Sequence, residues 1–594
     1  MARPIPCHDP RTFTCGRARA ITRRAIGART RACASFVVGV VLSAGAYELG
    51  AQSSARDAAP DLILLDGKVF TADTAHPWAE AVAIRGDRIM SVGTTQEIVR
   101  LAGPSTRRLP LGGRTVVPGF DDAHAHVGYA PLEGVDVVVD PSPTPDPTLA
   151  AVLDSIASAA RRAPPGGWIT TRVGGRVFND ERATRFVLDS AAPAHRVWLR
   201  GWSGHGGVLN TAALRSVGLL DAADQPGGWL TRDATGAPTG RIDEYAIYLT
   251  DHRLSVARAD SLLGPTMRED GEQGLRLGIT TVQDMAIAYD LAAARKVARR
   301  GEAMRVRHRV IRFPLPGIEG GWRSAWSVTG RDTALAPTMH VSGVKWVLDG
   351  TPIERLALMR RPYADRPGWH GRANFEFDTL RAILRDALTR RWQPHLHAVG
   401  DSTIALVIAA MRAEAPDSTW RRLRPRLEHA DALGRDQLAA VRALGIVVVQ
   451  NPSHLAIPDV MSARWGAQRL RAIDLMRTLV DSGIPLAIGS DGPREPGLNI
   501  MLATIHPNVP GEALTREQAV TAYTRGSAYA AFAEGERGTL APGMFADLAV
   551  LSQDVFTVPP NALPGTTSVL TIVGGRIVHD RLSAVGNQSR PPDQ

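Results

Sequence analysis

Six side chains able to bind a metal or transfer a proton each follow a short apolar run that reads as a β-strand. Side chains so distant in sequence can converge only if their strands are parallel neighbours that end at one edge. Catalytic residues gather in this way at the C-terminal mouth of a parallel barrel. Nitrogen and oxygen donors converging there predict a zinc-like hydrolytic centre. The six residues are His124, His126, Lys345, His397, His429 and Asp491.

Eight such apolar runs occur, and helical stretches separate the later ones. The helices expected at 377–391 and 434–445 have apolar residues three and four positions apart. Alternating strands and helices are typical of an α/β protein with a parallel sheet, and eight repeats predict a closed (β/α)8 barrel. The expected strands are 116–126, 278–285, 306–313, 344–350, 394–400, 426–432, 445–452 and 485–491.

The two ends of the chain share another pattern, in which short strands alternate with glycine turns. We expect residues 56–115 and 535–585 to build one small composite β-sandwich, because chain ends often meet in compact folds. The barrel, residues 116–534, is then inserted between the halves, and residues 586–594 form a tail.

One gap between the expected barrel strands is too long for a single crossover. We expect an inserted α/β segment at about 130–275 that covers the barrel mouth. A helix at 148–163 and a strand at 195–201 are predicted within it.

Residues 1–55 have the pattern of an export leader, with an arginine-rich start, the apolar run 34–46 and small residues after it. The first 33 residues hold eight arginines and one aspartate, so +7 of the net charge of +10 lies there and +3 remains elsewhere. The basic balance therefore does not predict a nucleic-acid partner. We expect a periplasmic or secreted protein without stable membrane insertion after cleavage. An uncleaved membrane anchor, a wrongly assigned start and a twin-arginine signal at Arg23-Arg24 remain alternatives.

The cysteines also belong to the leader, because Cys7, Cys15 and Cys33 all precede the apolar run. A cleaved chain would contain none, which excludes thiol catalysis, thiolate ligands and disulfides. No Gly-x-Ser-x-Gly motif occurs in the core either, so a covalent serine route is not expected.

His124 and His126 lie two apart on one expected strand, so both face the barrel interior and can hold one metal. His395 and His397 repeat this spacing. We choose His397 as the ligand because it lies nearer the strand end, and expect His395 to be packed deeper. Since adjacent strand residues point oppositely, a metal-facing His429 predicts that Glu428 faces the helices and is structural.

Lys345 and Asp491 each allow two interpretations. A lysine near a metal is favourable if carbon dioxide converts it into a carbamate ligand; alternatively its ammonium pairs with Asp349 or another acid. Asp491 can bind metal weakly and accept a proton from metal-bound water, or it can cap a helix.

The motifs GFDDAHAH, HAVGD, LEHAD, QNPSH and IGSDGP, in this order, resemble the amidohydrolase superfamily, most closely its amidohydrolase-3 (YtcJ-like) branch. The similarity extends from Asp61 to Asp580. It implies a distorted (β/α)8 barrel beside the composite β-sandwich, and one or two divalent metal ions, most often zinc. By the same resemblance, His124 and His126 are ligands on strand one, Lys345 lies on strand four, and the ligands of strands five and six are His397 and His429. Asp491 is then the acid/base on strand eight.

The expected reaction is hydrolysis of a non-peptide carbon–nitrogen bond in a small molecule by metal-bound hydroxide, with Asp491 as general base and acid. Esters, lactones or phosphoesters are alternative substrates of the same fold, and a non-catalytic metal-binding protein ranks last. His205 is a candidate donor to the substrate carbonyl, with a backbone-bonded loop histidine as its alternative. Homo-oligomerisation stays open. Further candidates for substrate contact are Arg241, Glu244, Tyr363 and His454.

Overall fold

A computed structural model describes residues 59–258, 260–316 and 332–582. The expected leader, residues 1–55, and the tail, residues 586–594, lie outside the described residues. The described residues all belong to one compact unit. None of the helices in the described ranges has both the length and the apolar character needed to cross a membrane.

Eight parallel strands form the central sheet, in the same order in space as in the chain. An antiparallel strand, β17 (Asp332–Ala336), pairs with β18 outside this series. Seven of the eight expected strands match these barrel strands, the exception being 116–126, and the (β/α)8 architecture is confirmed. The barrel strands are β8 (Phe120–Ala125), β15 (Ile279–Met285), β16 (Arg307–Arg312), β18 (Met339–Val347), β19 (Pro394–Ala398), β20 (Arg426–His429), β21 (Val447–Gln450) and β22 (Leu486–Ile488).

The first and last strands approach each other at the point where the barrel closes. The backbone N–H of Asp491 donates to the carbonyl of His124 at 2.8 Å, and Ser490 donates from its N–H and hydroxyl to Asp122 at 2.7 and 2.6 Å. Only glycine fits just before this contact, since a Cβ on Gly489 would lie 2.4 Å from the backbone nitrogen of His124. The seam therefore places Asp491 beside His124 of β8 and the His126 that follows it.

The run 116–126, expected as one strand, is two strands in different sheets. Residues Thr115–Pro118 form β7 of the β-sandwich, and the barrel begins only at Phe120. Gly119 lies between them, where a Cβ would come within 2.1 Å of the Thr280 hydroxyl. The absent side chain lets the chain pass closely against β15 as it changes sheets.

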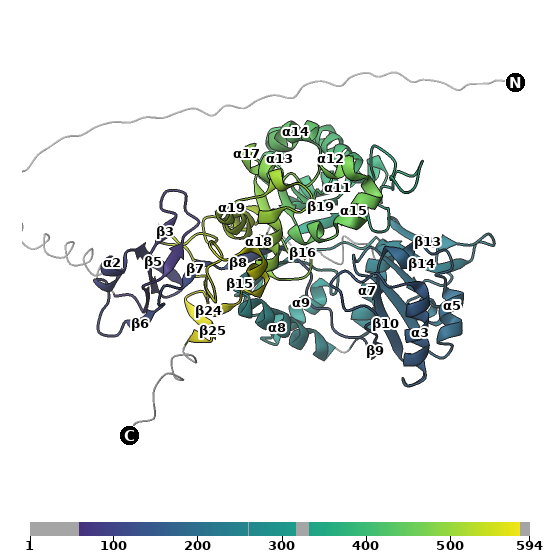
Figure 1. Ribbon diagram of the computed structural model, residues 1–594, viewed down its shortest axis with the longest axis horizontal. Helices are drawn as coiled ribbons and strands as arrows, with labels where there is room; N and C mark the ends of the chain where they lie inside the picture. Colours follow the sequence, from purple (N-terminus) through teal and green to yellow (C-terminus); the bar gives the residue numbers. More distant parts are fainter. Residues whose placement is uncertain (1–58, 259, 317–331, 583–594) are drawn as a thin grey trace, which may run out of the picture. The chain divides into compact units, whose positions relative to one another are not determined.

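Two sheets form the β-sandwich. One has the order β5-β4-β1-β6 and the other β25-β24-β23-β7-β2-β3, so strands from both chain ends share the second sheet (Figure 1). Apolar side chains of both sheets, among them Leu64, Val82, Val550 and Ile572, pack into one buried core. The strands are β1 (Leu62–Leu65), β2 (Lys68–Phe70), β3 (Trp78–Ala79), β4 (Ala81–Arg85), β5 (Arg88–Gly93), β6 (Arg107–Pro110), β7, β23 (Leu548–Leu551), β24 (Ser568–Val573) and β25 (Arg576–Asp580).

The inserted segment holds a third sheet, of order β13-β14-β12-β11-β10-β9. One face of this sheet packs Ile169 and Leu199 against helices α3 (Leu149–Ala160) and α5 (Arg185–Ala191). Because side chains alternate along a strand, Arg172 and Arg200 lie on the opposite face. The strands are β9 (Gly134–Asp136), β10 (Trp168–Val173), β11 (Arg196–Gly201), β12 (Gly206–Leu209), β13 (Gly228–Arg232) and β14 (Pro238–Glu244).

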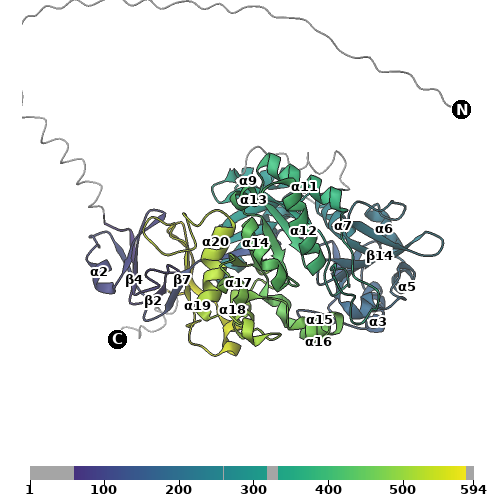
Figure 2. The same cartoon turned by 90° about the horizontal axis from the view of Figure 1, so that it is seen from above.

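Helices follow most of the barrel strands, and the predicted helices 377–391 and 434–445 correspond to α11 and α14. Helix α11 (Phe377–Arg390) packs beside α12 (Asp401–Glu414) (Figure 2), and α12 also contacts β19. The longer helices from the insertion's end onward are α7 (Tyr245–Ala257), α8 (Asp260–Arg276), α9 (Leu291–Arg299), α11 (Phe377–Arg390), α12 (Asp401–Glu414), α13 (Asp417–Leu423), α14 (Leu438–Leu444), α15 (Pro458–Trp465) and α18 (Pro496–Ile505). The shorter helices are α2 (Thr95–Val99), α4 (Gly175–Phe178), α6 (Thr211–Ser216), α16 (Ala467–Leu470), α17 (Met476–Asp481), α19 (Arg516–Thr521) and α20 (Ser527–Ala530).

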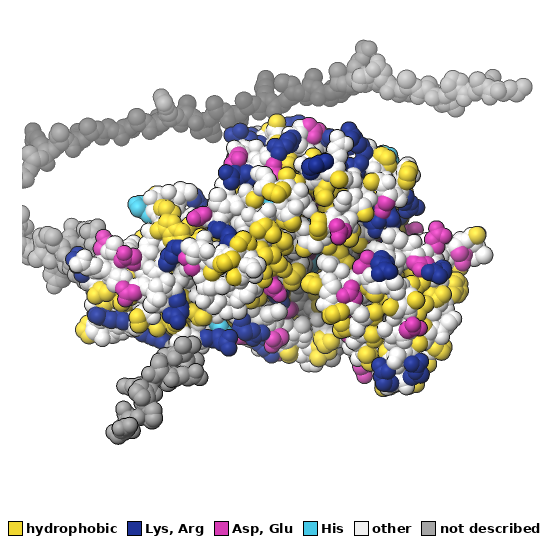
Figure 3. Space-filling model, in the orientation of Figure 1, with side chains coloured by type: hydrophobic (Ala, Val, Ile, Leu, Met, Phe, Trp, Pro, Cys, Tyr) yellow, Lys and Arg dark blue, Asp and Glu magenta, His cyan; other side chains and the backbone are white. Residues whose placement is uncertain are grey.

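Basic and acidic side chains are interspersed over the face drawn in Figure 3. Mixed charge of this kind is ordinary for the surface of a globular protein.

The barrel seam gives a stability prediction. Gly489→Ala forces a methyl group into the backbone of His124, and overpacking of this kind lowers the free energy of unfolding by about 1–3 kcal/mol. The matched control is Gly511→Ala, since no atom lies within 4 Å of the added Cβ there. Thermal unfolding of both variants tests this, and equal midpoints for the two would contradict it.

Candidate metal centre

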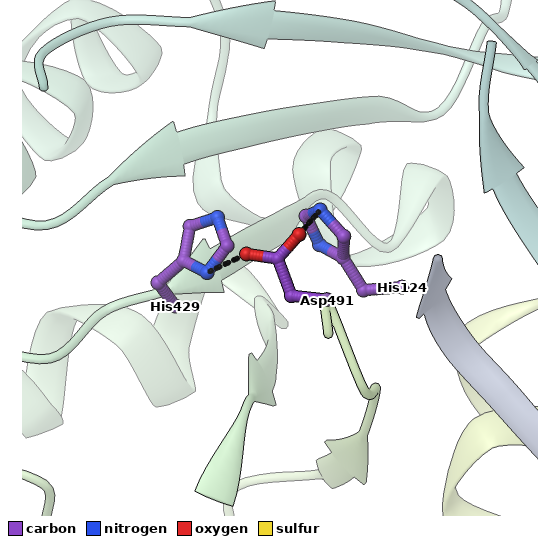
Figure 4. A group of neighbouring side chains, drawn as sticks. All are labelled: His124, His429 and Asp491. Carbon is purple, nitrogen blue, oxygen red and sulfur yellow. Dashed lines mark ion pairs between the residues drawn. The ribbon is translucent and has the colours of Figure 1, made fainter. Parts of the chain in front are cut away.

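His124, His429 and Asp491 come from β8, β20 and the loop after β22, and their ligand atoms lie within 4.8 Å of one another. Figure 4 shows the Asp491 carboxylate between the two imidazoles. Its oxygens lie 3.6 Å from Nε2 of His124 and 3.9 Å from Nδ1 of His429. Both histidines are buried, and the Asp491 side chain is 24% exposed. The three donors thus meet at a point that solvent can reach.

His126, which directly follows β8, also joins this group. Its Nε2 lies 3.1 Å from Asp491 Oδ1, and its Nδ1 lies 3.1 Å from the carbonyl of Met285. A carbonyl can only accept, so Nδ1 carries the proton, and in the neutral ring Nε2 presents a lone pair to the carboxylate. The lone pairs of His126 Nε2 and Asp491 Oδ1 repel each other at 3.1 Å unless a proton or a cation lies between them.

His124, like His126, uses Nδ1 as a hydrogen-bond donor and directs Nε2 toward Asp491. A buried carboxylate fixes this tautomer of His124. Its Nδ1 donates to Glu428 Oε2 at 2.7 Å, so Nε2 is left as the basic nitrogen facing Asp491. Burial, together with the nearby charge of Lys345, lowers the pKa of His124 to about 4. A metal-ligating histidine ordinarily donates its other ring nitrogen to a carboxylate in this way.

The position of Glu428 corrects the prediction that it faces the helices. Parallel pairing aligns it with His397, and its carboxylate contacts His124 and accepts from Arg426 at 2.7 Å inside the barrel. His429 reaches the same side because alternation stops there: φ is +72° at His429 and +53° at Ala430. This left-handed turn swings the imidazole to the barrel mouth, as extended backbone would not.

His397 lies next to His429 with ring centroids 4.4 Å apart. Its buried Nε2 finds no hydrogen-bond partner among the described residues. Burial, with the charges of His429 and His205, holds the pKa of His397 well below its ordinary value, which favours the neutral form that binds metals. His395 lies deeper and fully buried, with Nδ1 3.2 Å from Glu428 Oε1.

Lys345 is buried, and its Nζ lies 3.4 Å from His124 Nε2. Burial lowers the pKa of Lys345 to about 8. The alternative pairing with Asp349 is not what the structure shows, because that carboxylate accepts from the N–H groups of Val399, Gly400 and Leu358 and from the hydroxyl of Thr403. Lys345 instead directs its amine to the histidine cluster.

Two further histidines, both held by carboxylates, border the cluster. Nδ1 of His205 lies 3.1 Å from both oxygens of Glu244 and 3.0 Å from the Tyr248 hydroxyl. His454 lies between two acids, with Nδ1 3.2 Å from Asp431 and Nε2 3.4 Å from Asp491. Burial opposes the charged form of His454, but the two carboxylates raise its pKa to about 10. Asp491 keeps its charge, because His124, His126 and His454 offset its burial and hold its pKa well below the ordinary value.

The candidate ligands, together with His205 and His454, open onto one cavity of about 690 Å³, a size typical of a small-molecule site. Barrel residues form its floor, and the inserted segment contributes Arg172, Arg200, Trp202 and Tyr248 to the wall. His124, His126, Lys345, His205, His397, His429, His454 and Asp491 all line it.

Three residues predicted to contact substrate do not line this cavity. Arg241 pairs with Asp243 at 2.7 Å and stacks over Phe178. Glu244 is fully buried behind His205, and Tyr363 is buried with its hydroxyl donating to the carbonyl of Ala357. A residue in a loop or in the insertion can point into the cavity or away from it, and its position in the sequence does not show which.

Tyr248 and Asp431 line the cavity and were not predicted. Asp431 could have been predicted from the LEHAD motif. It lies two residues after His429, and an acid so close to a ligand at a strand end lies at the barrel mouth. Tyr248 lies in α7 with no motif around it, so only the fold brings it to His205.

The donor set is suited to a divalent cation. Imidazole nitrogens with lone pairs directed inward, an ionised carboxylate and an unpartnered buried nitrogen are the groups that zinc and similar ions bind. The chemistry of these side chains therefore fits a bound divalent cation.

Known proteins share both sequence and fold with this chain. It is 28% identical over 88% of its length to the "N-substituted formamide deformylase" of Arthrobacter pascens, covering 98% of that protein. It is 26% identical to the "putative amidohydrolase YtcJ" of Bacillus subtilis, over 87% of this chain and 98% of the relative. An uncharacterized metal-dependent hydrolase from Pyrococcus horikoshii shares the fold, with a TM-score of 0.64 at 21% identity, over 84% of this chain and 99% of that one.

The sequence model described as "Amidohydrolase family" matches residues 110–579. That range covers the barrel, the insertion and the C-terminal strands of the β-sandwich. The protein therefore belongs to the amidohydrolase family of hydrolytic enzymes.

Proposed function

We propose that the protein is a metal-dependent hydrolase that cleaves a non-peptide carbon–nitrogen bond of a small molecule. The observation that carries this is the convergence of His124, His429 and Asp491 within 4.8 Å, at the floor of a cavity of about 690 Å³. The name of the formamide deformylase among its relatives supports an amide as the bond cleaved.

The residues that would hold one or two divalent ions, with zinc as the first candidate, are His124, His126, His397, His429, Asp491 and Lys345. When bound, such an ion lowers the pKa of water toward neutrality and polarises a carbonyl oxygen. Lys345 can join the set as a carbamate: its neutral amine attacks carbon dioxide, a nitrogen–carbon bond forms and one proton leaves. The buried position beside His124 favours the neutral amine that this step needs.

Asp491 is the proposed proton carrier. Its carboxylate is ionised, reaches solvent in the cavity and lies 3.1 Å from His126 and 3.4 Å from His454. It can take a proton from the attacking water and deliver it to the leaving nitrogen, which departs readily only when protonated. His454 and its partner Asp431 hold the carboxylate in place from the other side.

His205 is the proposed donor to the substrate carbonyl. Burial would lower its pKa, but the carboxylate of Glu244, with Glu354 and Asp491 further away, raises it. Because Glu244 holds Nδ1, the second nitrogen is free to stabilise the negative charge that develops on the carbonyl oxygen.

The first experiment measures metal content and turnover together. We expect one or two equivalents of zinc or a similar ion per purified chain, loss of activity on chelation, and recovery when zinc is added back. N-(2-phenylethyl)formamide is the amide probe and 2-phenylethyl formate is its matched ester. Turnover of the ester alone would assign the protein to the esterases of this fold, and a fully active metal-free protein would refute metal dependence.

Asp491→Asn tests the proton carrier. The amide keeps the shape and most of the contacts of the side chain but cannot accept the proton, so we expect kcat to fall by about 10²–10⁴-fold. Metal content should stay within a factor of two, because the histidines remain. Asp481→Asn, an exposed acid on α17, is the control and should match the wild type. Wild-type turnover in the Asp491→Asn variant would remove the general-base role.

Glu428→Gln tests the residue that orients His124. We expect metal affinity to fall about 10–100-fold, because the Nδ1 proton loses its charged acceptor. Stability should fall by about 3–5 kcal/mol, since the buried Arg426 loses its carboxylate. The control is Glu414→Gln, whose partners Arg381 and Arg385 are more exposed, with an expected loss below about 1 kcal/mol. Zinc titration with chemical unfolding separates the two effects, and unchanged zinc affinity would contradict the orienting role.

A further inference from the structure

The cavity has a second polar region, built by the inserted sheet and separate from the histidine cluster. Arg172 of β10 and Arg200 of β11 pair in register as neighbours on parallel strands, so their side chains emerge from the same face. Both line the cavity, as do His124 and Asp491. The cavity therefore extends from the catalytic group on the barrel to two adjacent guanidinium groups on the insertion.

The positive charge of these arginines exceeds the negative charge of the acids around them. Arg200 pairs with Asp251 at 3.2 Å, and the same carboxylate also faces Arg258. Within the described part of the chain, Arg172 makes no ion pair; it donates to the carbonyl of Pro143 at 3.2 Å, and the charge of Asp136 acts on it from beyond ion-pair distance. This end of the cavity thus has an excess positive charge of about one unit, a count that takes each side chain in its ordinary ionised form.

Adjacent guanidinium groups repel unless an anion lies between them. The two here are held by structure, since β10 and β11 pair along six residues and Arg200 packs over Trp198 with 4.5 Å between the guanidinium carbon and the ring centroid. A planar carboxylate is the ligand that such forks bind best, with two parallel hydrogen bonds. A monoanion also matches an excess of one positive charge, and a phosphate dianion would not.

We propose that Arg172 and Arg200 bind a carboxylate that the substrate carries away from its scissile bond, so that the enzyme acts on amides of small amino acids or amino-aryl acids. This inference rests on the proposed function and adds the substrate class to it. The wall of the same cavity also includes Tyr129, Trp202 and Phe313. Aromatic and apolar surfaces there suit a hydrocarbon or aryl spacer between the amide and the carboxylate.

The test compares matched substrates on the zinc-loaded full-length protein. The neutral probe is N-(2-phenylethyl)formamide, and the acid probe carries a carboxylate at the para position of the ring. We expect kcat/KM for the acid to exceed that for the neutral amide by at least tenfold, mainly through KM. Equal values for the two would overturn the inference while leaving the proposed hydrolase intact. The para-phosphonate is the third probe, and a preference for it over the carboxylate would also overturn the inference.

Arg172→Met should lower the acid-to-neutral ratio of kcat/KM by about 10- to 100-fold, because a charged hydrogen bond is lost. Arg172→Lys keeps the charge without the planar fork and should recover part of the ratio. Arg196→Met is the matched control: Arg196 lies on the same strand as Arg200 and binds the carbonyl of Gly166 outside the cavity, so the ratio should stay at the wild-type value. An unchanged ratio in Arg172→Met would overturn the assignment of this residue.

A binding measurement keeps the inference testable if no formamide is cleaved. Calorimetry with 4-(2-aminoethyl)benzoate and with 2-phenylethylamine compares the acid and neutral amines directly. Tighter binding of the acid that is lost in Arg172→Met supports the carboxylate subsite even if the reaction is a different hydrolysis. Equal binding of the two amines rejects it.

Discussion

The buried contact between Arg426 and Glu428 holds the centre of the barrel together. Arg426 donates to both oxygens of that carboxylate, at 2.7 and 3.1 Å, and also to the carbonyl of Ala123 and to Gln283, each at 2.6 Å. Strands β8, β15 and β20 are thereby joined inside the barrel. The same carboxylate accepts from His124 at 2.7 Å. Packing of the barrel and orientation of a candidate ligand therefore depend on one ion pair, and losing it leaves a buried guanidinium without a counter-charge.

Sequence patterns predict the regular part of this architecture well. Most barrel strands are short apolar runs with a polar residue at or near the mouth, and this pattern is visible in a single sequence because the strands are buried. The meeting of His124, His126, His397 and Asp491 follows from parallel strands, and His429 joins them through the left-handed φ at its own position. What the patterns missed depends on single backbone angles or on loops. The left-handed φ at His429 lets its imidazole reach the barrel mouth although the neighbouring Glu428 also faces inward, and the absent side chain of Gly119 divided one expected strand between two sheets.

The cavity combines two structures with different tasks. The barrel supplies donors whose geometry is fixed by strand ends and by hydrogen bonds from neighbouring strands. The inserted sheet supplies the opposite wall, where Arg172 and Arg200 lie, and it is tied to the barrel cavity through α7, which carries Tyr248 to His205. With this division, changes in the insertion can alter which substrate binds while the barrel keeps the same reaction. Loops at the mouth of a (β/α)8 barrel vary substrate preference in the same way.

The seam between β22 and β8 also determines when the site can exist during synthesis. Ser490 and Asp122, which close the seam, are 368 positions apart. A ribosome must therefore have made more than four-fifths of the chain before the first histidine pair meets its carboxylate. The β-sandwich is completed later still, because β23, which pairs with β7, and β24, which pairs with β23, follow the barrel sequence. Folding is thus dominated by late, long-range pairing, which is intrinsically slow and leaves the early histidines without their final neighbours for most of translation.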